Sequence, residues 1–240
     1  MGAQWKQAGR VENAMKRGQV VGKCAKEITV AAKLGGTDPD MNARLYAALE
    51  AARKHSVPRD TIDRALKRGA GLTDDKVTIE HVVYEGFTPA KVPVVVECLT
   101  DNKNRTASDI RVLFRDGHLG SLGSVAWMFD HLGVVEAHHA DKSIDIEGAA
   151  IEANAQNVEP MEESEVPEGR TGARFFCLLT DLNAVSKFLT KTGWQVTVSE
   201  MRYIAKNPVE LKPEDRKVVV EFLSAIDDHD DVHRVYAGLK

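Results

Sequence analysis

The feature that most constrains the fold is a change in hydrophobic period near residue 76. Before it, apolar residues recur at helical spacing in three segments, about 11–34, 40–54 and 58–69, with glycine or proline residues between them. Beyond the polar linker 72–76, short apolar runs alternate with amphipathic stretches, which is typical of strands alternating with helices. We therefore expect a small helical module followed by a larger part that contains both helices and strands.

The order of elements after the linker predicts how the larger part is built. The predicted succession is strands at 79–84 and 92–99, a helix at 106–116, strands at 124–130 and 133–138, a helix at 143–155, strands at 157–162 and 173–180, a helix at 181–192, strands at 194–199 and 200–206, a helix at 213–226 and a strand at 231–236. Within it, 133–199 has the order β-α-β-β-α-β of ferredoxin-like units. The elements on either side are incomplete alone, so we expect them to join in one sheet.

The predicted fold class is α+β, with an N-terminal helical bundle followed by two α/β sandwich domains, the ferredoxin-like one inserted in the other. The predicted domains are 1–76, a basic helical domain; 77–132 plus 200–240, a discontinuous α/β domain; and 133–199, the inserted domain. Such an insertion is tolerated where the two ends of the inserted unit lie close together, as they often do in a β-α-β-β-α-β unit.

Charge is distributed unevenly along the chain, which the overall net charge of −4 conceals. Residues 1–76 contain 15 Lys and Arg against 9 Asp and Glu, a net of +6, whereas 77–240 contain 17 against 27, a net of −10. A basic part on an acidic body favours an anionic partner, and we predict nucleic-acid phosphates. The alternative is an ordinary solvated helix face. The candidate contacts are Lys6, Arg10, Lys16, Arg17, Lys23, Lys26, Arg44, Arg53, Lys54, Arg59, Arg64, Lys67, Arg68, Lys103 and Arg105.

The segment DNKNR, 101–105, places two cations between a predicted strand and a predicted helix. We interpret it as a tight turn at a helix N-terminus, where free backbone N–H groups and the helix dipole favour anions. Lys103 and Arg105 would then contact a phosphate or RNA backbone together with the basic N-terminal part. The alternative is a structural turn in which Asp101 simply pairs with Arg105.

The remaining motifs do not favour catalysis, a cofactor or a metal. The sequence has no Walker A or GxGxxG motif, and Ser121 and Ser124 lack the surroundings of a GxSxG nucleophile. The acidic segment 227–233 is predicted to be a solvated turn, because adjacent residues in such a turn do not converge on a metal ion. We therefore expect no enzyme activity, no cofactor and no small-molecule substrate.

Aromatic and sulfur-containing residues indicate the core and the compartment. Trp127 and Tyr46 are predicted to pack in the core, whereas Trp5 is the better candidate for contact with nucleic-acid bases. No apolar run reaches the roughly 18 residues of a membrane span and no secretory signal is visible, so we expect no membrane partner. The cysteines are far apart in apolar surroundings, as expected for reduced thiols of a cytoplasmic protein; they are Cys24, Cys98 and Cys177.

Several segments together resemble one known family. They are KRGQVVGKCAKEITVAAKLGGTDPDMNARL, VPRDTIDRALKRGAG, VVYEGF, VECLTDNKNRTASDIR and LGSLGSVAWMF. Over nearly its whole length the chain is similar to the YebC/PmpR family. The resemblance implies a helical N-terminal domain and two α/β domains, one inserted in the other. The chain departs from the family pattern in its shorter basic N-terminal segment and in YEGFTPAK, where the family has the glycine-rich YEGYGPGG.

The functional hypothesis is a non-enzymatic nucleic-acid-binding regulator of the cytoplasm. The resemblance implies a DNA-binding protein that regulates transcription. Its mitochondrial and bacterial relatives imply the alternative of a ribosome-associated translation factor that binds ribosomal RNA. Both alternatives use the same electrostatic attraction to phosphates, so the sequence does not separate them. A second alternative is a protein–protein adaptor whose acidic body docks a basic partner.

Overall fold

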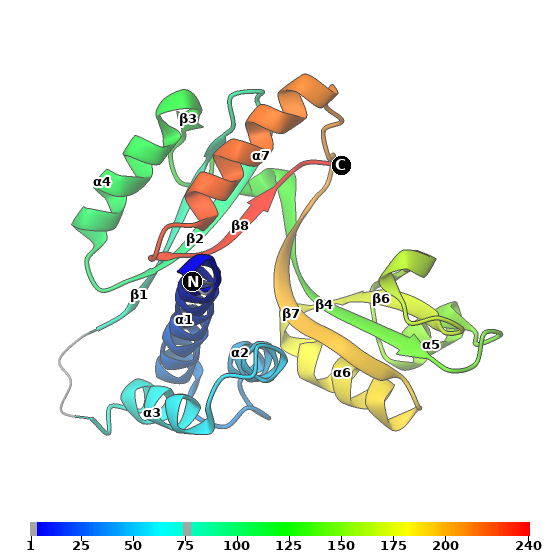
Figure 1. Ribbon diagram of the computed structural model, residues 1–240. Coiled ribbons are helices and arrows are strands. Elements are labelled where there is room, and N and C mark those ends of the chain that lie inside the picture. Colours follow the sequence, from blue (N-terminus) through cyan, green and yellow to red (C-terminus); the bar gives the residue numbers. More distant parts are fainter. Residues whose placement is uncertain (1–3, 74–77) are drawn as a thin grey trace.

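The computed structural model describes residues 4–73 and 78–240, with side chains from Arg17 onward. A helical head, α1 to α3, is followed by two antiparallel four-stranded sheets that carry helices, so the fold is α+β as predicted. In Figure 1 the head lies below the first sheet and beside the second, and α1 approaches the turn that precedes β8.

The head consists of α1 (Gln4–Gly35), α2 (Ala43–Lys54) and α3 (Arg59–Gly69). Ile28 of α1 and Leu45 of α2 are fully buried in its core. Asn42 caps α2, because its side-chain oxygen accepts from the backbone N–H of Leu45 at 3.1 Å while its amide donates to the carbonyl of Ala31 at 2.8 Å. Helix α2 therefore begins about three residues later than the predicted segment 40–54, because Asn42 ties its start to the end of α1.

The first sheet has the strand order β3-β1-β2-β8, and all neighbours are antiparallel. Its elements are β1 (Glu80–Phe87), β2 (Pro93–Thr100), α4 (Lys103–Leu113), β3 (His118–Leu119), α7 (Pro213–Asp227) and β8 (Val232–Ala237). Helices α4 and α7 cover the same face (Figure 1), where Val94 of β2 packs with Ile110 and Ile226. The rings of Phe114 and Phe222 meet edge to face with centroids 5.4 Å apart, which completes this core.

The second sheet has the strand order β5-β6-β4-β7, and it is built by the ferredoxin-like succession that the sequence predicts. Its elements are β4 (Phe129–His139), α5 (Ile146–Glu152), β5 (Asn157–Pro160), β6 (Thr171–Cys177), α6 (Leu182–Lys191) and β7 (Gln195–Ala205). Phe175, Leu182 and Leu189 are fully buried in one core beneath both helices. The sheet and its helices therefore share a single apolar layer.

Strands β4 and β7 correct the predicted boundaries. The sequence suggested two strands, one on either side of residue 131, and two strands that meet near residue 199. The structure has one strand of 11 residues, β4, at the first position and one of 11 residues, β7, at the second. The two strands pair antiparallel along nearly their whole length, from Phe129 opposite Ala205 to His138 opposite Gln195. This continuous pairing makes each of them a single strand. Residues 124–128 are not a strand, and 126–128 form a 3₁₀ turn. The division into three domains stays a prediction, and two of its boundaries fall inside these long strands.

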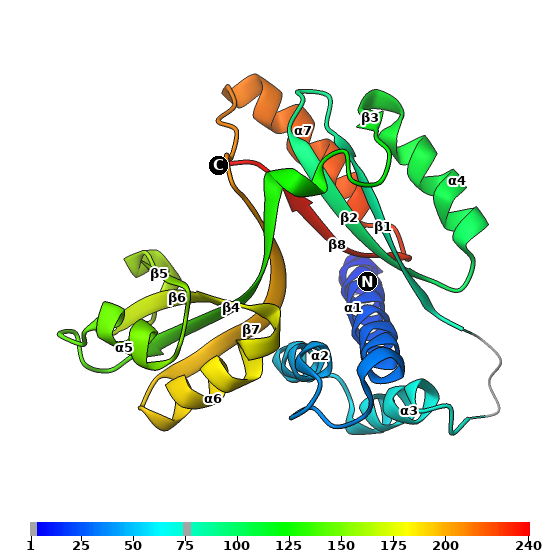
Figure 2. The same cartoon turned by 180° about the vertical axis from the view of Figure 1, so that it is seen from behind.

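The head contacts the two sheets differently (Figure 2). Helix α2 lies against β7 and α6, where Ala47 joins the core of the second sheet and the Tyr46 hydroxyl meets the Ser186 hydroxyl at 2.9 Å. Helix α1 meets the first sheet through a small apolar cluster of Val30, Ile79 and Leu99 and through polar contacts. Polar contacts thus hold the head on both sides, since Lys187 of α6 also pairs with Asp40 at 2.5 Å, and α2 packs more extensively on the second sheet than α1 does on the first.

Candidate nucleic-acid interface

Exposed cations gather on α3 and at the C-terminal end of α2. Helix α3 buries Ala65 on α1 and turns its charged residues outward, because its apolar and charged residues recur on opposite faces. Within the described part of the chain, Arg64 donates to its own helix, at the carbonyl of Asp60 (3.1 Å) and the hydroxyl of Thr61 (3.4 Å). The exposed cations of these two helices are Arg53, Lys54, Arg59, Arg64, Lys67 and Arg68.

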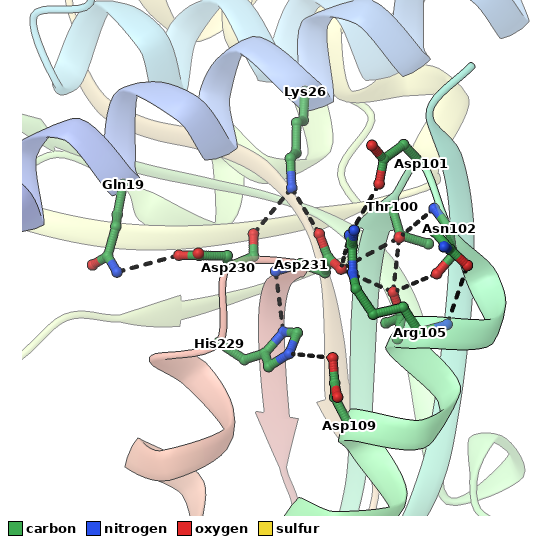
Figure 3. Close-up of polar contacts among 11 residues, drawn as sticks. Gln19, Lys26, Thr100, Asp101, Asn102, Arg105, Asp109, His229, Asp230 and Asp231 are labelled. Atoms are coloured by element: carbon green, nitrogen blue, oxygen red, sulfur yellow. Dashed lines mark hydrogen bonds and ion pairs between the residues drawn. The ribbon is translucent and has the colours of Figure 1, made fainter. Parts of the chain in front are cut away.

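A second set of cations, Lys23 and Lys26, lies on α1 and faces the turn between α7 and β8, and Figure 3 shows Lys26 at this turn. The Lys23 ammonium donates to the carbonyl of Asp227 at 2.7 Å. The Lys26 ammonium donates to the carbonyl of Asp230 at 3.1 Å and to the carboxylate of Asp231 at 3.0 Å. These α1 cations therefore neutralise an acidic turn of the same chain.

Asp231 is the centre of this cluster, and its side chain is only 5% exposed. Arg105 donates to its carboxylate at 2.8 Å, and the Thr106 hydroxyl does so at 2.9 Å. Burial alone would raise the pKa of the Asp231 carboxyl, but the hydrogen bonds from Arg105, Lys26 and Thr106 outweigh it and lower the pKa to about 2. Asp231 is therefore ionised at neutral pH and joins α1, α4 and β8.

The acidic segment 227–233 is only in part the solvated turn that the sequence suggested, because Asp227, Asp228 and Asp230 are exposed whereas Asp231 is not. Asp231 is buried, and its N–H donates to the His229 ring at 3.1 Å, while the other ring nitrogen of His229 lies 3.3 Å from Asp109. The prediction was wrong for Asp231, because this residue meets cations from α1 and α4, which are distant in the sequence. Among the residues with described side chains, no group of His, Cys, Asp and Glu could hold a metal ion.

The segment 101–105 is likewise not a tight turn. Asn102 is the N-cap of α4, and its side chain accepts from the backbone N–H of Arg105 at 3.1 Å. Lys103 and Arg105 therefore lie in the first helical turn. Lys103 pairs with Glu80 at 2.5 Å, and Arg105 pairs with Asp101 at 2.9 Å as the structural alternative expects. The contact of Arg105 with Asp231 adds a long-range partner that neither interpretation included.

Arg44 has a different environment from the exposed cations. Its guanidinium donates twice to Glu27, at 2.7 and 3.0 Å, inside the contact between the head and β8. Burial would raise the pKa of the Glu27 carboxyl, but the hydrogen bonds from Arg44 and the nearby charges lower it to about 2. Burial lowers the pKa of the neighbouring His233 to about 4, so this imidazole is neutral at pH 7. Arg44 thus stabilises a buried carboxylate.

Two aromatic predictions have different outcomes. Tyr46 is half-buried where the head meets α6. Trp127 is 68% exposed, so its predicted place in the core was wrong. The cause is Glu85, a buried carboxylate that accepts from the backbone N–H groups of Gly123, Val125 and Ala126 at 2.7 Å each. These bonds close the loop so that the indole points outward, and a glutamate within a strand gave no signal of this.

Some of these cations border a cleft of about 820 Å³ between the head and strands β7 and β8. Lys23 of α1 lines it together with Arg53 and Lys54 of α2. Arg17 is exposed on α1. The side chains of Lys6, Arg10, Lys16 and Trp5 lie outside the described residues. Cations of α1 and α2 therefore meet at this cleft, whereas those of α3 lie outside its lining.

Comparisons with known proteins identify the family. The model of the "TACO1/YebC protein N-terminal domain" matches residues 2–72, and that of the "TACO1/YebC second and third domain" matches 79–239. The chain belongs to the TACO1/YebC family. This confirms the resemblance that its sequence motifs show.

Full-length relatives of the TACO1/YebC chain carry regulatory names. A "Probable transcriptional regulatory protein" of Polaromonas sp. is 51% identical, over 100% of this chain and 99% of its own. Another of the same description from Bdellovibrio bacteriovorus is also 51% identical, over 100% of both chains. A crystal structure of a conserved hypothetical protein from Aquifex aeolicus has a TM-score of 0.77 at 33% identity and covers 94% of this chain and 90% of that one. No helix in the described part of the chain is long and apolar enough to cross a membrane.

Proposed function

We propose that this member of the TACO1/YebC family is a non-enzymatic nucleic-acid-binding regulator of the cytoplasm. The observation that carries the proposal is the group of exposed cations on α2 and α3, on a head whose net charge is opposite to that of the body. The names of its relatives support regulation, and buried free thiols are in keeping with a reducing compartment.

In the proposed contact, the head binds the phosphate backbone of the nucleic acid. Lys and Arg side chains on an exposed helix attract the phosphates of a nucleic acid whatever its base sequence. Such binding weakens steeply as the salt concentration increases. Arg53, Lys54 and Lys67 supply such charges in the proposed contact. Arg44 is excluded from it because Glu27 holds its guanidinium in a partly buried ion pair.

Duplex DNA is the first target that the proposal names, because the relatives are called transcriptional regulatory proteins. RNA carries the same phosphate groups, so the alternative of a ribosome-associated translation factor belongs in the same experiment. The adaptor alternative instead requires the acidic body to bind a basic protein partner.

The test compares two charge-matched double variants. Arg64→Ala/Lys67→Ala removes two exposed cations of α3, and Arg115→Ala/Lys217→Ala removes two exposed cations of the body. Fluorescence polarisation with a mixed-sequence DNA duplex and with single-stranded RNA measures affinity across a salt series. The α3 variant should bind both at least about tenfold more weakly, and its salt slope should fall by about two, roughly one for each lost phosphate contact.

The body variant should bind like the wild type. Equal binding by the α3 variant and the wild type would refute the proposal. If neither nucleic acid binds at low salt, the adaptor alternative replaces it. Co-sedimentation with ribosomes beside the duplex titration separates the two targets, since a preference for ribosomes that the α3 variant loses would select the translation factor.

A further inference from the structure

One face of α1 is covered by acidic groups of the same chain. Gln19, Lys23 and Lys26 follow one another at intervals of four and three residues, so they lie on one side of the helix. All three meet the turn at the end of α7: Gln19 donates to the Asp230 carboxylate at 3.3 Å, and the two lysines donate to carbonyl oxygens of the turn. Figure 3 shows Gln19 and Lys26 reaching toward this turn.

The charges at this contact do not leave a positive surface. Three cations, Lys23, Lys26 and Arg105, pair with three carboxylates, and a fourth carboxylate accepts from the neutral Gln19. The carboxylates are those of Asp101, Asp227, Asp230 and Asp231. A phosphate would therefore be repelled here unless the turn moved away. The acidic turn therefore covers the side of α1 that carries these lysines.

Two of the carboxylates add charge without being needed for the fold. The side chain of Asp227 is 60% exposed, and its nearest carboxylate oxygen is 3.9 Å from the Lys23 ammonium. Asp230 is exposed, and its carboxylate accepts only from Gln19 among the bonds resolved here. Exposed pairs of this kind contribute little to stability, so their charge can be removed while Asp231 remains.

The contact is also less extensive than the one between α2 and the second sheet. On the first sheet, the buried apolar part consists of Val30, Ile79 and Leu99, and the remaining contacts given above are polar. On the second sheet, Ala47 belongs to the main core, and Tyr46 adds a hydrogen bond. A polar contact is the one that a competing polyanion can replace, whereas apolar packing is indifferent to it.

We propose that the acidic turn 227–231 shields the cationic face of α1, and that nucleic acid reaches Lys23 and Lys26 only by displacing this turn. The inference rests on the proposed function and adds a regulatory contact to it. The cations of α3 make the first contact, and the α1 face adds to it when the turn is displaced. Removing acidic charge from the turn should therefore strengthen binding.

The experiment uses the full chain and the same DNA duplex and RNA. Asp227→Asn/Asp230→Asn removes two charges from the turn. Glu214→Gln/Asp215→Asn removes two charges from exposed residues at the other end of α7. The turn variant should bind about three- to tenfold more tightly than this control, since two carboxylates that repel phosphate are removed from the turn while the lysine contacts with its carbonyl groups stay the same in both proteins. Thermal melting checks that both variants stay folded. If the double variant of the turn does not fold, the single variant Asp227→Asn takes its place in the binding experiment.

Lys23→Ala then shows whether the gain passes through α1. In the wild-type protein, Lys23→Ala should weaken binding less than twofold, because the acidic turn already holds the Lys23 ammonium. In the Asp227→Asn/Asp230→Asn variant, Lys23→Ala should remove most of the increase in affinity. Equal affinities of the turn variant and its control would overturn the shielding, as would an equal effect of Lys23→Ala in both backgrounds. Neither result touches the proposed function, which depends on the loss of binding in Arg64→Ala/Lys67→Ala.

Discussion

Asp231→Asn tests the central ion-pair cluster, because asparagine keeps the size of the side chain and removes its charge. The wild-type carboxyl has a pKa of about 2 in the folded state. Relative to an ordinary aspartate pKa of about 3.9, this depression corresponds to about 2–3 kcal/mol of folded-state stability at neutral pH. The side chain is 5% exposed, so water screens these interactions weakly. The variant should lose about 2 kcal/mol at pH 7.

The pH dependence follows from the direction of the shift. A carboxyl whose pKa is lower in the folded state stabilises it above the unfolded pKa, and this stabilisation is lost as the pH falls from about 4 toward about 2. Asparagine resembles the protonated acid, so the difference between wild type and variant should shrink over the same range. Glu27, whose pKa is also about 2, is present in both proteins, and its contribution cancels in the difference.

Urea unfolding of both proteins at several pH values between 7 and 3 measures this difference. Asp228→Asn is the matched control in the same turn, because Asp228 is exposed; it should change the free energy of unfolding by no more than about 0.5 kcal/mol. A loss below about 0.5 kcal/mol for Asp231→Asn at pH 7, or a loss that stays constant as the pH falls, would refute the reasoning.

Three further changes test other contacts, each by urea unfolding. Glu27→Ala should cost about 3–5 kcal/mol because it leaves the partly buried Arg44 unpaired, whereas Arg53→Ala at an exposed pair should cost under about 0.5 kcal/mol; similar costs would contradict this. Glu85→Gln should lower the free energy of unfolding by about 1–3 kcal/mol, because a single amide oxygen replaces the carboxylate that accepts from three N–H groups. An unchanged stability would argue against this role of Glu85. Gly69→Ala should cost about 1–3 kcal/mol, because its Cβ would lie 2.6 Å from the Thr29 carbonyl; a stabilised variant would show that α3 shifts freely on α1.

Local patterns in the sequence were sufficient for the elements and for much of their order. Helical spacing of apolar residues identified the head, and alternating strands and helices identified the ferredoxin-like unit. These patterns succeed because an element must bury one apolar face, and that face is written in residues close together in the chain. The uneven charge and the family motifs are likewise properties of the sequence alone.

Element boundaries and side-chain partners depended on tertiary structure. Strands β4 and β7 are single long strands because each pairs with the other across about 60 intervening residues. Trp127 is exposed because Glu85 closes its loop from another strand. Asp231 is buried and ionised because Lys26, from α1, and Arg105, from α4, meet it at β8. Electrostatic energies depend on distance and burial, which only the folded chain sets, so a row of aspartates in the sequence does not show whether water or cations surround it.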